Sequence, residues 1–135
     1  MSRFQAAQIT IGKKDADHVS ISIIGCLNAW MNASIQISAD TWTGTCRAEF
    51  AKGELRQFAS EIENLYKELS GVALLRPIEP YLELKLTGDG IGHVLVEGKA
   101  QDRLSVGTSL LFQFEVDQTE LPAIISELRS ADSGI

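Results

Sequence analysis

Few side chains in this sequence combine a reactive type with a spacing that chemistry could use. The best candidates are His93, Asp89 four residues before it, and Asp102 nine residues after it. A histidine near carboxylates could move protons or contact a partner, but no known motif places a Ser or Cys nucleophile beside it. We interpret His93 as a partly exposed strand histidine bonded to a cross-strand neighbour, and Asp102 as a loop cap. Convergence of all three in one cleft would favour an enzyme instead.

The sequence has no spacing typical of metal or cofactor sites. Its only histidines are His18 and His93, and neither an H-x-x-x-H nor a C-x-x-C motif occurs. The glycines of residues 88–92 lack the Lys and Ser or Thr that complete a phosphate loop. A calcium loop would need more carboxylates than Asp89 and Glu97. We therefore expect no metal, no cofactor and no catalytic residue.

Charge limits the class of partner. The chain of 135 residues has 12 Lys and Arg against 18 Asp and Glu, a net charge of -6. Phosphate binding needs clustered cations, so nucleic acid is not expected as a partner. The excess of acid belongs to residues 71–135, which hold five cations and ten anions. Such a surface either keeps a protein soluble or steers a basic protein partner toward it.

Hydropathy predicts a cytoplasmic, soluble protein. No apolar run approaches the roughly 18 to 20 residues that span a bilayer. The first residues lack the apolar core of a signal peptide. The two cysteines, Cys26 and Cys46, are expected to be buried free thiols, because a domain of this size folds without disulfides.

The elements that position these residues follow from hydrophobic periodicity. Apolar residues alternate with polar ones through residues 18–23, 31–38 and 42–50, with a further strand expected around residues 6–11. This period of two predicts strands with one buried and one polar face. Alternation returns in residues 81–99, which predict a hairpin whose tight turn uses Gly88, Asp89 and Gly90, and again in residues 108–116.

Two segments have helical spacing instead. Leucines, Phe58 and Ile62 recur every three or four residues from residue 55 to 69, and Gly71 is expected to end this helix. A second stripe runs from residue 121 to 128. Pro122 fits only in a first turn, so we predict Thr119 as its N-cap.

The two halves of the chain match at an offset of 66 residues. The offset places Glu49, Glu54, Leu55 and Glu61 on identical residues, and a strand leads directly into a helix at both places. Duplication and chance similarity of like elements both remain open. Either way, we predict one α+β domain over residues 1–135: a two-layer fold with an antiparallel meander sheet covered on one face by two helices. Its other face would be open and polar.

That open face supplies the candidate contacts to a partner. Outward parity places Glu83, Glu97 and Glu115 on three strands of the acidic half. Trp30 has outward parity as well, and is either a partner contact or packed at a sheet edge. Trp42 has buried parity and is expected in the core.

Two separated segments resemble a known bacterial family. They are LTGDGIGHVLVEGKAQD, residues 86–102, and LLFQFEVDQTELPAIISEL, residues 110–128, and they resemble the WapI-type immunity proteins. The resemblance implies a small cytosolic protein that binds a cognate toxin domain and blocks it, without catalysis. The shared positions look like turn and cap residues: Gly88, Asp89, Gly90, Gly92, His93, Val94, Gly98, Asp102, Asp117, Gln118, Thr119, Leu121 and Pro122.

We therefore predict a stoichiometric, protein-binding inhibitor whose partner is a basic toxin domain. One alternative is a general protein-interaction module unrelated to toxins. Another is a small-molecule binder or enzyme, which would need a concave apolar pocket with converging polar groups. A toxin-like gene next to this one would favour the first hypothesis, and an operon of metabolic genes the last.

Overall fold

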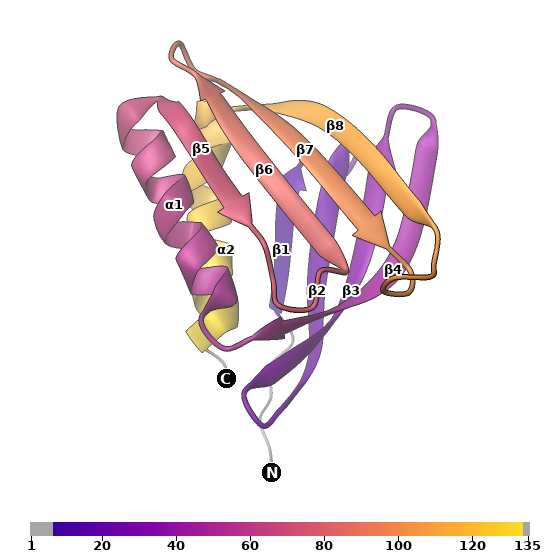
Figure 1. Cartoon of the computed structure of the whole chain (residues 1–135). Helices are drawn as coiled ribbons and strands as arrows, with labels where there is room; N and C mark the ends of the chain where they lie inside the picture. The colour runs from indigo at the N-terminus through magenta and orange to yellow at the C-terminus, as the bar shows by residue number, and fades with distance from the viewer. Residues whose placement is uncertain (1–6, 134–135) are drawn as a thin grey trace.

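The computed structural model describes residues 7–133, and within them the chain forms four strands and a helix, twice in succession (Figure 1). The start predicted for the first strand, residue 6, lies outside the described residues. A short 3-10 turn, Gln118–Glu120, leads into the last helix. The elements are β1 Ala7–Gly12, β2 His18–Leu27, β3 Trp30–Ala39, β4 Trp42–Ala51, α1 Glu54–Glu68, β5 Ser70–Leu75, β6 Leu82–Asp89, β7 His93–Gln101, β8 Ser109–Asp117 and α2 Leu121–Ser133.

The strands form two antiparallel sheets. The first sheet has the order β1-β2-β3-β4 and the second sheet the order β5-β6-β7-β8. The α+β class and the succession of strands, helix, strands and helix are confirmed. Our prediction of a single sheet is wrong. Helix α1 separates β4 from β5, and each of these strands is an edge of a different sheet. Strand β5, a short apolar run directly after α1, was not predicted.

Both sheets turn one face toward a shared core. In the first sheet Ile9, Ile21 and Ile35 are cross-strand neighbours and are fully buried. Inner side chains of the second sheet and the apolar stripes of both helices belong to the same hydrophobic cluster. The predicted strand parities are confirmed by the burial of Val19, Ile21, Ile35, Ile37, Leu84, Val94, Phe112 and Phe114.

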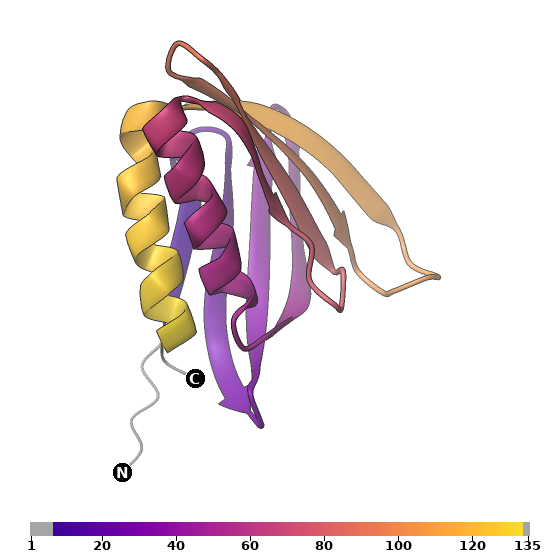
Figure 2. The same ribbon diagram turned by 60° about the vertical axis from the view of Figure 1, so that its left-hand side comes forward.

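The helices close one side of this pair of sheets. Helix α1 packs beside β5 and α2 beside β1, and the two helices pack on each other. Figure 2 shows both helices on one side and the sheets separating with distance from them. Among the described residues no helix covers the opposite side, between β4 and β8, which we call the open side. The prediction that Trp42 lies in the core is therefore wrong: its parity is inward, but it is 68% exposed at the open side.

The two helices are held by equivalent glutamates. Glu61 on α1 accepts the backbone N–H of Leu74 on β5 at 2.8 Å, and Glu127 on α2 accepts that of Thr10 on β1 at 2.9 Å. These glutamates are 66 residues apart. Each clamps the edge strand of one sheet by pairing one of its outward backbone N–H groups.

The starts of the helices repeat the same contact. Glu54 accepts the N–H of Ala51 at 2.6 Å, and Glu120 accepts that of Asp117 at 3.0 Å. Both pairs preserve the offset of 66, which supports an internal duplication. The cap that we predicted at Thr119 is wrong: Asp117 is the N-cap and accepts the Thr119 N–H at 2.9 Å, because the 3-10 turn begins before the proline.

The ends of the helices differ from each other. Helix α1 ends at Glu68, and its C-cap is Leu69, with a φ of 60°, two residues before the predicted Gly71. In the last turn of α2, Asp132 is 3% exposed. It accepts the N–H of Gly53 at 3.0 Å and lies 3.4 Å from the Arg56 guanidinium. The end of α2 thereby caps the start of α1. No helix of the described residues is long and apolar enough to cross a bilayer.

Candidate functional site

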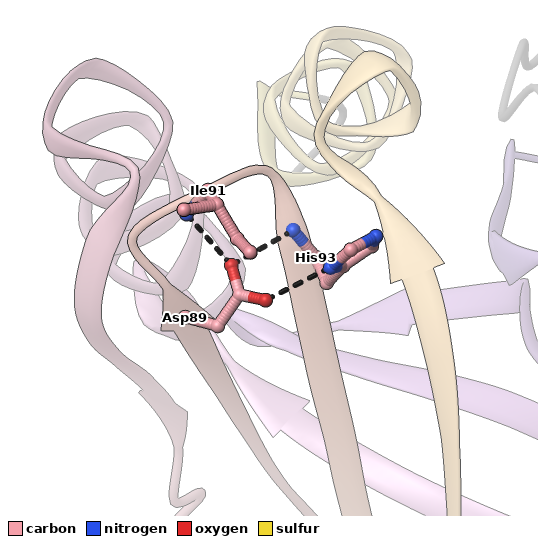
Figure 3. Close-up of polar contacts among 3 residues, drawn as sticks. All are labelled: Asp89, Ile91 and His93. Atoms are coloured by element: carbon pink, nitrogen blue, oxygen red, sulfur yellow. Dashed lines mark hydrogen bonds and ion pairs between the residues drawn. The ribbon is translucent and has the colours of Figure 1, made fainter.

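The turn between β6 and β7, residues 88–92, is organised by one carboxylate (Figure 3). Asp89 Oδ1 accepts the backbone N–H groups of Ile91 at 2.8 Å and His93 at 3.0 Å. Its Oδ2 lies 2.9 Å from His93 Nδ1. Gly90 and Gly92 have φ values of 90° and 111°, a region that side chains disfavour. The sequence G-D-G-x-G-H thus encodes a closed turn, which we call the GDG turn.

Gly88 serves the turn differently. Its φ is not positive, but a Cβ there would lie 2.7 Å from the Leu69 carbonyl oxygen. That carbonyl also accepts the N–H of Gly90 at 2.8 Å, joining the end of α1 to the GDG turn. Gly88 is therefore needed for the close approach of two backbones.

Electrostatics favour the charged forms of the two side chains of the turn. Hydrogen bonds from Ile91 and then His93 lower the pKa of Asp89. The hydrogen bond and charge of Asp89 raise the pKa of His93, and the carboxylates of Glu115 and Asp117 raise it further. The His93 ring and the Asp89 carboxylate are both solvent-accessible.

Asp102 does not join this pair. It lies beyond the far end of β7 and accepts the Thr108 N–H at 2.8 Å, as a loop cap. A strand of that length separates it from His93 by roughly 30 Å. Within residues 7–133, no group of three or more His, Cys, Asp or Glu side chains is arranged to hold a metal ion.

The cysteines also lie apart. Cys26 and Cys46 are free and half-buried, each on the inner side of the first sheet. Burial, and then the charge of Asp102, raise the pKa of the Cys46 thiol. A thiol kept protonated is a weak nucleophile.

The structure brings the two separated sequence motifs together. The Gln118 N–H donates to the Gly92 carbonyl at 2.8 Å, and His93 pairs with Asp117 in the sheet register. The GDG turn thus packs against the D-Q-T residues that start α2. Asp117 and Glu120 form a capping box there, so both side chains bond the backbone at the start of this turn.

The outer face of the second sheet is charged but mixed. Glu83 lies opposite Lys99, and Glu97 lies opposite Lys85. Glu115 instead lies opposite Leu95. Cross-strand lysines therefore offset two of the three predicted contact residues. Acidic side chains outnumber basic ones around a hollow of about 300 Å³ near the GDG turn, whose lining includes Asp17, Glu115, Asp117 and Glu120 with Lys13 and His93.

A second hollow, of about 490 Å³, lies at the open side. Trp42 and Leu111, 68% and 74% exposed, stand at its rim. We did not predict this groove. One sequence signal was available, because the consecutive leucines 110 and 111 break the alternation of β8 and force one of them outward. Its lining residues are Ala39, Asp40, Trp42, Glu97, Gly98, Leu110, Leu111, Phe112 and Gln113.

Trp30 lies far from this groove. It pairs with Leu27 and Ala51 on the outer face of the first sheet, at the opposite end of the β3–β4 hairpin from Trp42. It is half-buried. Its contact with a partner stays a prediction.

Comparison with known proteins gives two findings. A family profile described as the "Immunity protein WapI-like family" matches residues 9–131. The crystal structures of Trypanosoma brucei MRP1/MRP2 have a similar fold, with a TM-score of 0.52 and 9% identity over 93% of this chain and 82% of that chain. At that identity the likeness concerns the fold alone. No curated protein sequence matches significantly.

Proposed function

Since the chain belongs to the WapI-like immunity protein family, we propose that it is a stoichiometric inhibitor that binds a cognate bacterial toxin domain in the cytoplasm. The profile match over residues 9–131 is the observation that carries this proposal, because it spans both sheets and both helices. The protein acts by occupying the toxin, and its own residues take no part in catalysis.

The toxin domain is basic on this proposal. The net charge of -6 supports it, as does the gathering of Glu115, Asp117 and Glu120 near the GDG turn. Electrostatic potentials of opposite sign on two proteins raise their association rate more than they lower the dissociation rate of the complex. Glu115 contributes most on the outer face, since lysines oppose Glu83 and Glu97.

Coexpression tests the proposal directly. The toxin domain encoded beside this gene is produced with and without the protein, and cell survival and the mass of the purified complex are measured. We expect survival only with the protein, and a complex with one copy of each chain. Failure of the pure proteins to associate would overturn the inhibitor proposal, as would protection without a complex.

A charge reversal tests the steering. Glu115→Lys should lower the association rate by about tenfold at low salt, and the difference should shrink at high salt. Glu68→Lys on α1 is the matched control, because it makes the same change of charge on an exposed side chain of the helix side. Reversal at Glu83 or Glu97 would place two lysines opposite each other, so Glu115 is the cleaner test. Equal rates for both variants would contradict the basic partner.

A further inference from the structure

The open side of the sheets carries a more specific inference, which rests on the proposed function. We propose that an extended segment of the toxin adds as a strand to the free edge of β8. This segment places a bulky apolar side chain against Trp42 and a neighbouring Lys or Arg between Asp40 and Glu97.

The first support is the free edge itself. Strand β8 pairs with β7 alone, and β4 with β3 alone. At the other side α1 packs beside β5 and α2 beside β1, and Glu61 and Glu127 each bond one backbone N–H of these edges. At β8, every second residue directs its N–H and C=O away from β7, where an extended chain can pair with them.

The second support is the apolar groove beside that edge. Trp42 and Leu111 are each more than two-thirds exposed, and Leu110 and Phe112 lie beneath them. Edge strands usually carry charges that discourage pairing, whereas this end of β8 has two leucines. An exposed tryptophan over a packed apolar floor is typical of binding hot spots. Phe112 gives the floor rigidity, because its ring fills the space that a Cβ at Gly98 would occupy.

The third support is the charge of the lining. Asp40 and Glu97 are its charged residues, and both are acidic; Lys85 lies opposite Glu97 on β6, so Asp40 is the one without a lysine beside it in the register. The backbone at Asp40 is fixed, since its N–H donates to Asp17 Oδ1 at 2.9 Å. This argues for a basic segment. It also argues against a second copy of this chain, which would bring four carboxylates into one interface.

Truncation of Trp42 tests the groove. The probe is the purified toxin domain encoded beside this gene, titrated against the full chain. Trp42→Ala should weaken binding by about 30-fold or more, the threshold of a hot spot. Val72→Ala is the control: Val72 is 46% exposed on β5, beside α1 and away from the open side, and its truncation should change affinity by less than about threefold.

The results separate this inference from the proposed function. If the wild-type chain does not bind the toxin domain, the proposed function fails. If it binds, and Trp42→Ala has no more effect than Val72→Ala, the groove is not the interface. Leu111→Ser is a second variant at the rim and should also weaken binding, so the test does not depend on one substitution.

Hydrogen exchange tests the added strand. On binding, alternate amides of residues 109–117 should exchange more slowly, while the amides bonded to β7 change little. Protection confined to residues outside β8 would overturn the strand addition. Asp40→Asn combined with Glu97→Gln should reduce the salt dependence of affinity. A dimer of the protein alone that Trp42→Ala dissociates would show that a second copy occupies the groove, and would overturn the proposal.

Discussion

The two halves of the molecule build the same unit and present different outer surfaces. In each half a glutamate at the helix start binds the backbone three residues earlier, and another, seven residues on, clamps an edge strand. Glu63 and Arg129, at equivalent positions, pair with each other at 2.7 Å across the two helices. The contacts that make the fold are thus repeated.

The outer faces are where the halves diverge. The outer face of the second sheet carries Glu, Lys and Leu side chains, and acidic side chains with no lysine opposite them lie near the GDG turn. That of the first sheet is mostly neutral, with hydroxyl and amide groups. Its members include Gln8, Ser20, Ser22, Asn32, Ser34, Gln36, Ser38, Thr43 and Thr45. The repeated core contacts suggest that the fold constrains the core residues. The differing outer faces suggest that a partner constrains the surface residues.

The largest expected effects come from truncating equivalent core side chains of the two halves. Phe58 and Ile124 occupy the same place in α1 and α2, and both are buried. Phe58→Ala should lower the free energy of unfolding by about 3 to 5 kcal/mol, and Ile124→Ala by about 2 to 5 kcal/mol. Urea titration should show one transition in each variant, because the helices pack on each other. Two separate transitions would mean that the halves unfold independently.

The edge clamps should give the next largest effect. Glu61→Ala and Glu127→Ala each leave a part-buried backbone N–H unpaired, at a cost of about 1 to 3 kcal/mol. Glu→Gln at either position keeps an acceptor and should recover part of the loss. Similar losses of unfolding free energy for Glu61→Ala and Glu127→Ala would support the equivalence of the two clamps. A cost at one position alone would show that only one helix depends on its clamp.

The helix caps should differ between the halves. Gly53 starts α1 with no capping side chain of its own and is bonded by the distant Asp132, whereas Asp117 starts the turn before α2 with its own side chain as the cap. Asp117→Ala should therefore lower the thermal midpoint, and more than Thr119→Ala, since Thr119 contributes its backbone N–H. The reverse order in a melting experiment would restore Thr119 as the cap.

The smallest effect concerns the His93–Asp89 pair. Asp89→Asn keeps an oxygen for the Ile91 and His93 N–H groups but removes the charge, so the pKa of His93 should fall toward its ordinary value. An NMR titration of the ring protons measures this. An unchanged pKa would mean that Glu115 and Asp117 dominate.

The same pair predicts a pH window for stability. The pKa of His93 is raised by folding, so its contribution is complete below about pH 6.5 and is lost as the pH rises through the folded value. The pKa of Asp89 is lowered, so its contribution is present above about pH 4 and is lost as the pH falls through the folded value. The wild type should therefore exceed Asp89→Asn in stability chiefly between these limits.

Periodicity predicted most of the elements but not their assembly. A period of two determines which residues face inward, so the burial of Ile21, Val94 and Phe112 followed directly. It does not say which strands pair. Strand β5 was missed because a short apolar run can be a strand, a loop or a helix end. Without β5, the strand that forms one edge of the second sheet was absent from the prediction.

The candidate site shows the same limit. The GDG turn and the D-Q-T residues were found because glycine, aspartate and proline have local conformational roles. Trp42 was misplaced because parity gives the direction of a side chain and not whether anything covers it. Cover depends on the angle between two sheets, which local sequence does not specify. The charged face was predicted without the lysines opposite Glu83 and Glu97, because their pairing depends on register.

The interlocking of the chain ends has a consequence for the timing of folding in the cell. Glu127 binds β1 over a separation of 117 residues, and Asp132 caps α1 over a separation of 79. A ribosome delivers β1–β4 and α1 first, when α2 is not yet made. The first sheet then has neither its edge clamp nor the cap of its helix, and its apolar face is uncovered. The native packing of the first half is therefore completed only after synthesis has passed Asp132.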